Sequence, residues 1–262
     1  MQTILDKIVA TKHLEIVALK QSTTLDELKR RAADAPAVRD FAAAIRNHSG
    51  VSLIAEVKKA SPSKGLIRAD FDPREIARTY EACGAQCISV LTDEQYFQGK
   101  LEYLSAIRDV VSIPLLRKDF ILDEFQVVEA RAAGADAVLL IAECLSAEKL
   151  RELHDQIVEW GMTPLVELYD ANNLPAVLAC NPKLVGVNNR DLNTFVVRLE
   201  HSVEMKQQMP DDILFVSESG IATHADVQFL ARSGVDAMLV GESLTREPDI
   251  ASAVRQLIGQ AS

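Results

Sequence analysis

The stretch Ile54-Ala55-Glu56-Val57-Lys58-Lys59-Ala60-Ser61-Pro62-Ser63-Lys64-Gly65 begins as an apolar strand, ends in charged residues and continues into a turn-rich loop. Side chains alternate along a strand, so Glu56 and Lys58 share one face, where each can shift the pKa of the other. One such pair on its own is usually a salt bridge at the rim of a fold. Whether the Glu56–Lys58 pair has a functional role therefore depends on which other residues of the chain lie beside it.

The same pattern, a short apolar run that ends in polar groups, recurs four times further along the chain. These runs are 114–119 with Lys118, 164–167 with Glu167, 184–191 with Asn188 and Arg190, and 214–220 with Glu218. Polar groups so far apart in sequence converge only if the strands that carry them are parallel neighbours. The chain therefore predicts one site at the carboxyl ends of several parallel strands.

A repeated sequence motif indicates how the strands and helices are arranged. Gly84, Gly134 and Gly234 each stand between a helical pattern and a buried strand, at intervals that are multiples of about 25 residues, the length of a strand-plus-helix unit. Helix starts occur at Asp72-Pro73 and at Ser146. The predicted strands lie near 52–57, 87–91, 113–117, 136–141, 163–167, 184–188, 213–217 and 237–240.

Eight parallel strands with crossover helices predict an α/β fold, a (β/α)8 TIM barrel, whose active site lies at the carboxyl ends of the strands. A doubly wound open sheet is the alternative, but no G-x-G-x-x-G follows the first strand. Residues 1–50 precede the barrel and predict an N-terminal helical extension packed on the barrel of residues 51–262, within a single domain. A lid over the substrate is a hypothesis for this extension, and deleting residues 1 to 45 should then raise KM.

Glycines also mark the ends of the last two predicted strands, at Ser219-Gly220 and at Leu239-Val240-Gly241-Glu242. Barrels of this kind commonly bind phosphate there through backbone N–H groups, and glycine lets an anion approach closely. We therefore expect a phosphorylated small-molecule substrate. The side chain of Glu242 should point away from it, because a carboxylate repels a dianion.

Net charge and composition limit the classes of partner and the compartments that are compatible with the sequence. A formal net charge of -10 argues against a nucleic-acid partner, and no uncharged apolar run approaches the ~18 residues of a membrane helix. The four cysteines form no C-x-x-C pair and the first residues resemble no signal peptide, which predicts a cytoplasmic protein. We interpret all five histidines as surface residues, expect no metal site, and take a monomer as the working hypothesis.

The motifs resemble the signature blocks of the indole-3-glycerol-phosphate synthase family. The resemblance runs from Ile4-Leu5-Asp6-Lys7-Ile8 to the last helix, and the Glu-x-Lys and Ser-Pro-Ser set around Ser61 is its most specific part. It implies a carbon–carbon lyase of tryptophan biosynthesis, a decarboxylase without metal or cofactor. The enzyme would convert 1-(2-carboxyphenylamino)-1-deoxyribulose 5-phosphate into indole-3-glycerol phosphate, carbon dioxide and water.

The resemblance also implies roles for the strand-end residues. Lys118 would be the general acid and Glu167 the general base, while Glu56 and Glu218 would tune the lysines. Lys58 would pair with substrate anions. The remaining residues would bind substrate. Arg190, beside Asn188, would bind the aromatic carboxylate. An apolar slot for the ring would be formed by Phe97, Phe120 and Leu139, although these three could equally be ordinary core residues.

Two other functions remain open from the residues alone. Lys118 among carboxylates could form a Schiff base, as in a sugar-phosphate aldolase. The chain could also be a non-catalytic barrel that binds a phosphorylated ligand, although the presence of acid, base and supporting carboxylates argues against it. Trapping with borohydride and a Lys118→Ala variant distinguish these alternatives from the lyase.

Overall fold

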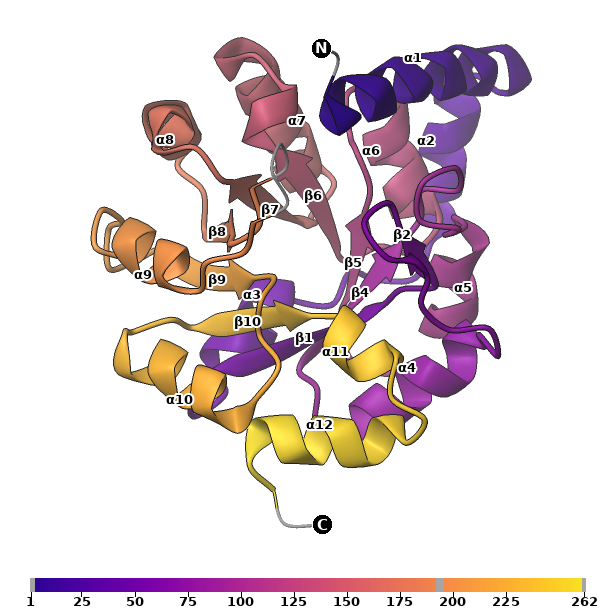
Figure 1. Cartoon of the computed structure of the whole chain (residues 1–262). Coiled ribbons are helices and arrows are strands. Elements are labelled where there is room, and N and C mark those ends of the chain that lie inside the picture. Colours follow the sequence, from indigo (N-terminus) through magenta and orange to yellow (C-terminus); the bar gives the residue numbers. More distant parts are fainter. Residues whose placement is uncertain (1–2, 192–195, 261–262) are drawn as a thin grey trace.

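The computed structural model describes residues 3–191 and 196–260. It is a closed barrel of eight parallel strands surrounded by a ring of helices, with further helices before the first strand (Figure 1). The (β/α)8 barrel predicted from the sequence is confirmed, and so is a helix before it.

Around the barrel the strands follow the order β1-β10-β9-β8-β7-β6-β5-β4, so the first strand pairs with the last. In chain order they are β1 (Ser52–Val57), β4 (Cys87–Leu91), β5 (Leu115–Lys118), β6 (Ala137–Ile141), β7 (Thr163–Leu168), β8 (Leu184–Asn188), β9 (Leu214–Glu218) and β10 (Ala237–Val240). The predicted strands coincide with these to within two residues at each end. A two-stranded hairpin, β2 (Ala60–Ser61) and β3 (Gly65–Leu66), follows β1.

Each barrel strand is followed by at least one helix. These helices are α4 (Pro73–Ala82), α5 (Glu102–Arg108), α6 (Glu124–Ala132), α7 (Ala147–Glu159), α8 (Leu174–Ala179), α9 (Glu200–Lys206), α10 (His224–Arg232), α11 (Glu242–Thr245) and α12 (Ile250–Ile258), with short 3-10 turns at η1 (Ala142–Cys144) and η2 (Ala171–Asn173). Asp72 caps α4 and Ser146 caps α7, as their sequence signals predict.

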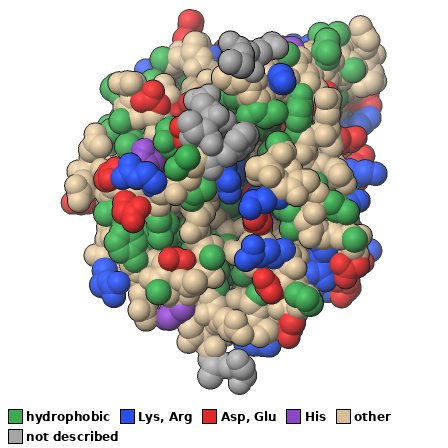
Figure 2. Space-filling view, in the orientation of Figure 1, with side chains coloured by type: hydrophobic (Ala, Val, Ile, Leu, Met, Phe, Trp, Pro, Cys, Tyr) green, Lys and Arg blue, Asp and Glu red, His purple; other side chains and the backbone are tan. Residues whose placement is uncertain are grey.

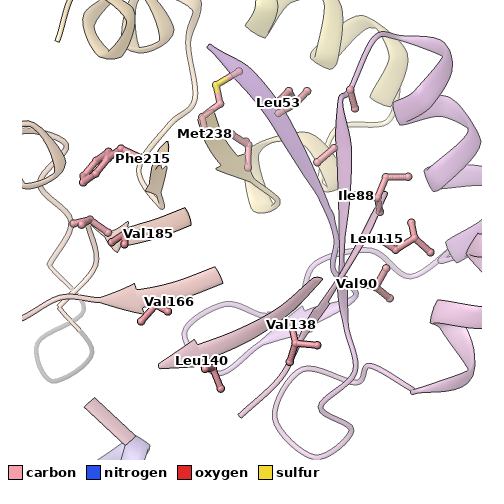
Figure 3. Packing of buried hydrophobic residues seen from close by; sticks show 14 of the residues in the cluster. Leu53, Ile88, Val90, Leu115, Val138, Leu140, Val166, Val185, Phe215 and Met238 are labelled. Atoms are coloured by element: carbon pink, nitrogen blue, oxygen red, sulfur yellow. The ribbon is translucent and has the colours of Figure 1, made fainter. Parts of the chain in front are cut away.

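Alternation along the strands divides the core into two layers. Side chains such as Leu53, Val138 and Phe215 point outward and pack against the helices (Figure 3). Their neighbours in sequence, such as Ile54 and Leu139, point inward and fill the barrel. The inward positions that follow, nearest the carboxyl ends, are the ones that carry charge.

The N-terminal extension runs along the whole length of the barrel. Its helices are α1 (Ile4–Ser22), α2 (Leu25–Asp34) and α3 (Phe41–Arg46). Leu28 and Ala32 of α2 pack on Val128 of α6. Phe41 and Ile45 of α3 belong to the inner layer of the barrel, so α3 closes its amino-terminal end. The sequence did not predict α3.

Candidate active site

A cavity of about 310 Å³ opens at the carboxyl ends of the strands. Basic and acidic side chains gather around the hollow at the centre of this face (Figure 2). The cavity lining includes all sixteen residues that the sequence singles out: Glu56, Lys58, Ser61, Phe97, Lys118, Phe120, Leu139, Glu167, Asn188, Arg190, Glu218, Ser219, Gly220, Leu239, Gly241 and Glu242. Residues spread over the chain therefore share one site.

Lys118, the last residue of β5, is the centre of the charged part of the cavity. Its Nζ lies 2.9 Å from Glu218 Oε2, 3.3 Å from Glu167 Oε2 and 3.9 Å from Glu56 Oε1. The three carboxylates come from β9, β7 and β1 and are almost fully buried. Glu56 also forms an ion pair with Lys58, two residues along the same face of the chain.

Burial and mutual charge set the pKa values of this cluster. Burial raises the pKa of Glu218 to about 8, and the adjacent Glu167 adds to the rise. For Glu167, burial is outweighed by Lys118 and by hydrogen bonds with Glu218 and Asn188, which hold its pKa below its usual value. Burial opposes the charge of Lys118, yet the three carboxylates raise its pKa overall. At neutral pH, Lys118 is an ammonium, Glu167 a carboxylate and Glu218 mostly a carboxylic acid.

Two glycines leave space for two of these carboxyl groups. A Cβ atom on Gly186 of β8 would overlap Glu218 Oε1, and one on Gly241 would overlap Glu56 Oε2. Gly186 faces the barrel interior and was not among the site residues predicted from the sequence. The available signal was a glycine inside an apolar strand, which often marks the close approach of another group.

Asn188 and Arg190 stand at the end of β8. Asn188 Nδ2 donates to Glu167 Oε1 over 3.2 Å, and its Oδ1 accepts the backbone N–H of Arg190 over 3.0 Å. Asn188 thereby orients the Glu167 carboxylate. The partly exposed guanidinium of Arg190 reaches the cavity rim, where a planar anion can bind it.

Glu242 belongs to the cavity lining, and its carboxylate lies 3.6 Å from Lys64 Nζ and 3.9 Å from a guanidinium nitrogen of Arg190. That this side chain points away from a bound phosphate stays a prediction. These two cations attract it toward the mouth. Both lie on other loops, so the sequence around Glu242 carried no sign of them.

The aromatic side of the cavity is formed by Phe97 and Phe120, whose ring centroids are 6.3 Å apart, and by Leu139 on the inner face of β6. Both rings remain partly exposed to the cavity. On the opposite side, Ser219 and Gly220 have φ of 69° and 80°, and Gly241 precedes the short helix α11. The left-handed backbone turns the loop after β9 toward the cavity.

Comparisons with known proteins identify the family of the chain. The family model for indole-3-glycerol phosphate synthase matches residues 5–257. The chain belongs to the indole-3-glycerol phosphate synthase family. An indole-3-glycerol phosphate synthase of Rhodopirellula baltica is 53% identical over 256 residues, covering 98% of this chain and 99% of the relative. One from Geobacillus thermodenitrificans is 49% identical over 258 residues, covering 98% and 97%.

Among solved structures, a 3-hexulose-6-phosphate synthase aligns with a TM-score of 0.65 at 15% identity, covering 80% of this chain and all of that one. Similarity at this identity shows the barrel fold alone. The indole-3-glycerol phosphate synthase family predicted from the sequence motifs is confirmed by the sequence comparisons.

Thirteen residues of the cavity lining were not singled out from the sequence, and three of them belong to the N-terminal extension. Ile4, Leu5 and Ile8 of α1 cover part of the opening. The lid hypothesis placed the extension near the substrate, but the sequence did not indicate which of its side chains would face the cavity. Within the described residues no helix is long and apolar enough to span a membrane, and no group of His, Cys, Asp and Glu could hold a metal ion.

The interpretation of every histidine as a surface residue was wrong for His154. This residue is buried on the inner side of α7, and its Nδ1 lies 3.1 Å from Asp155 Oδ1. His154 falls at a position of α7 that faces the barrel, where packing overrides polarity. It lies outside the cavity lining.

Proposed function

We propose that this chain converts 1-(2-carboxyphenylamino)-1-deoxyribulose 5-phosphate into indole-3-glycerol phosphate, carbon dioxide and water. The observation that carries the proposal is the Lys118 ammonium, held by three buried carboxyl groups in a cavity with an aromatic wall on one side and a glycine-rich loop on the other. A substrate with an aromatic ring at one end and a phosphate at the other fits this layout.

The first step forms a carbon–carbon bond. The ring carbon that bears the carboxylate attacks the substrate ketone, and the ketone oxygen takes a proton from Lys118. The raised pKa keeps Lys118 protonated before the reaction. It can still give up its proton, because the alkoxide that develops during ring closure is more basic than an amine. Glu56, Glu167 and Glu218 keep the ammonium in place until that oxygen appears.

The second step releases carbon dioxide. The bond between the ring carbon and the carboxylate breaks, and its electron pair restores the aromatic ring. Arg190 binds the carboxylate before cleavage, with its backbone held by Asn188. Phe97, Phe120 and Leu139 hold the ring, and their low polarity favours loss of the charged group.

The third step closes the indole. Glu167 accepts a proton from the carbon next to the ring nitrogen while the hydroxyl group, protonated within the site, leaves as water. Its lowered pKa keeps Glu167 ionised and ready to accept that proton. Glu218 is mostly protonated near neutrality, so it can donate a proton to the other charged groups of the site during this step.

The remaining residues bind the ends of the substrate. Backbone N–H groups at Ser219, Gly220 and Gly241 face the phosphate, with Leu239 beneath them, and Lys58 pairs with substrate anions from the opposite side. Ser61 contacts the substrate from the loop after β1. Glu242 limits how far an anion can move toward the rim.

We further propose that the protein acts as a monomer in the cytoplasm, without a cofactor and with neither nucleic acid nor membrane as partner. Four unpaired cysteines suit a reducing compartment. The acidic net charge supports the absence of a nucleic-acid partner.

The test mixes the purified protein with the substrate in the presence of a chelator and follows the appearance of indole fluorescence. Lys118→Ala should keep substrate binding and lower kcat by about 100-fold to 10,000-fold, the range for loss of a general acid. Lys149→Ala, a surface change on α7, is the control and should keep full activity. Binding without turnover by the wild-type protein would contradict the proposal.

Borohydride distinguishes the lyase from a Schiff-base aldolase. A protonated amine has no free electron pair to attack a carbonyl, and the raised pKa of Lys118 keeps it protonated. We therefore expect no covalent adduct by mass spectrometry after borohydride treatment with substrate. A reduced adduct on Lys118 would favour the aldolase.

A further inference from the structure

Lys12 is a buried lysine in the middle of α1, outside the machinery described above. Its side chain is 2% exposed, and its Nζ lies 2.9 Å from Asp93 Oδ2, 2.9 Å from Asp119 Oδ1 and 2.7 Å from Glu15 Oε2. The side chains of Asp93 and Asp119 are 0% and 3% exposed. Lys12 lies four residues after Ile8 and four residues before Ile16, so it shares the buried face of α1 with two isoleucines.

The two buried carboxylates each order one wall of the aromatic slot. Asp93 Oδ1 accepts the backbone N–H groups of Tyr96 and Phe97 over 2.7 and 3.2 Å. Asp119 Oδ1 accepts the N–H of Phe120 over 2.8 Å. Asp93 lies in the loop after β4 and Asp119 in the loop after β5, and each has an oxygen 2.9 Å from Lys12 Nζ. Without Lys12, two buried negative charges would therefore lie close to each other.

The helix that carries Lys12 supplies another side of the same slot. Ile4, Leu5 and Ile8 line the cavity from the first two turns of α1. A second contact ties α1 to the loop after β4, since the Tyr96 hydroxyl lies 2.9 Å from Thr11 Oγ1. One ammonium group therefore joins the three segments that surround the aromatic end of the cavity.

Docking of α1 alone does not require a buried charge. Lys20, on the same helix, forms an exposed ion pair with Asp123 at 2.7 Å, which holds the helix to the barrel at little desolvation cost. Burying a charge costs several kcal/mol and is tolerated when its partners compensate it fully. Asp119 also has Arg117, 3.4 Å from its Oδ2, but among the ion pairs of the described residues Asp93 has Lys12 as its only cation.

We propose that Lys12 is a positioning residue for the aromatic end of the substrate: by neutralising Asp93 and Asp119 it fixes the separation of Phe97 and Phe120 and seats α1 over them. Lys12 does not line the cavity and acts through the two carboxylates. The inference rests on the proposed function, because it takes the aromatic slot to hold the 2-carboxyphenylamino group.

The test compares Lys12→Met with Lys20→Met. Methionine keeps the length of the side chain and removes its charge. For Lys12→Met we expect KM to rise by about tenfold or more, with a smaller change in kcat, because loss of a buried charge partner is costly while Lys118 and its carboxyl groups are untouched. Inhibition by 2-aminobenzoate should weaken by a similar factor, and inhibition by inorganic phosphate should stay within about twofold. Lys20→Met should match the wild type.

A second variant separates positioning from folding. Lys12→Met combined with Asp93→Asn removes the unpaired charge, so the double variant should recover part of the lost affinity for 2-aminobenzoate, a non-additive result. If Lys12→Met does not fold, Asp93→Asn alone gives the same comparison of the two inhibitors.

Three outcomes overturn the inference. They are a lower Tm with unchanged KM and unchanged 2-aminobenzoate inhibition, an equal weakening of both inhibitors, and strict additivity in the double variant. Wild-type turnover in the same assay tests the proposed function separately. A wild-type protein without turnover would reject the function, while the inhibitor comparison would still report on the slot.

Discussion

At the scale of single residues, the site contains one carboxyl group, Glu218, that is mostly protonated at neutral pH. Burial against Glu167 raises the pKa of Glu218 to about 8 from a usual value near 4.5. A group whose pKa is raised on folding stabilises the folded state below its unfolded pKa, and this contribution is lost as the pH rises through the folded value. The contribution of Glu218 to the free energy of unfolding therefore falls progressively as the pH rises from about 4.5 to about 8.

This linkage predicts the behaviour of Glu218→Gln. A neutral amide does not ionise, so the stability of the variant should rise relative to that of the wild type between about pH 6 and pH 9, by about 1 kcal/mol or more. Urea unfolding at the two pH values measures the gain. Glu159→Gln, an exposed change, should show no such difference, and a constant gap between Glu218→Gln and wild type would contradict the prediction.

The sequence located the charged residues of the cavity because parallel strands bring their carboxyl ends together, so strand positions alone sufficed for Glu56, Lys118, Glu167 and Glu218. It gave no information about residues whose partners are set by contacts between distant segments. Lys12 meets carboxylates that lie more than 80 positions along the chain, and Glu242 meets two cations on other loops. Local periodicity carries no information about such partners.

At the scale of elements, α3 was the largest omission. Six residues give too few turns for a hydrophobic period to be visible. The helix exists because Phe41 and Ile45 fill the amino-terminal end of the barrel. Deleting residues 1 to 45 would remove most of α3 together with α1, so loss of folding after that deletion would not bear on a lid.

The position of α3 predicts a separation of stability from activity. Phe41→Ala removes a fully buried ring and should lower the free energy of unfolding by about 3–5 kcal/mol, while KM stays unchanged because the ring lies at the end of the barrel opposite to the cavity. Urea unfolding and steady-state kinetics measure the two quantities. The control is Leu14→Ala, an exposed position of α1, where we expect a change within about 0.5 kcal/mol. A KM that rises with Phe41→Ala would contradict the separation.

At the scale of the whole molecule, the extension contacts the barrel at the mouth, along its side and at its closed end. We therefore propose that residues 1–50 and the barrel of residues 51–262 unfold as one cooperative unit. The single tryptophan, Trp160, packs against both the main core and the cluster that joins α2 to α6. It reports directly on the contact between extension and barrel.

Two probes should then follow the same transition. We expect Trp160 fluorescence and far-UV circular dichroism to give coincident unfolding curves in urea, since the extension cannot separate without exposing Leu28, Ala32 and Phe41. Trp160→Phe supplies the fluorescence background. A fluorescence change at lower urea than the loss of circular dichroism would show instead that the extension detaches first.

The pairing of β1 with β10 also bears on how the protein is made. A ribosome delivers β1 early and β10 last of the eight strands, so the growing chain holds an open sheet with exposed strand edges for most of its synthesis. Gly241, which leaves space for the Glu56 carboxylate, emerges with that final strand. The pocket is therefore complete only once the sheet has closed. A nascent chain that stops before β10 lacks part of the pocket.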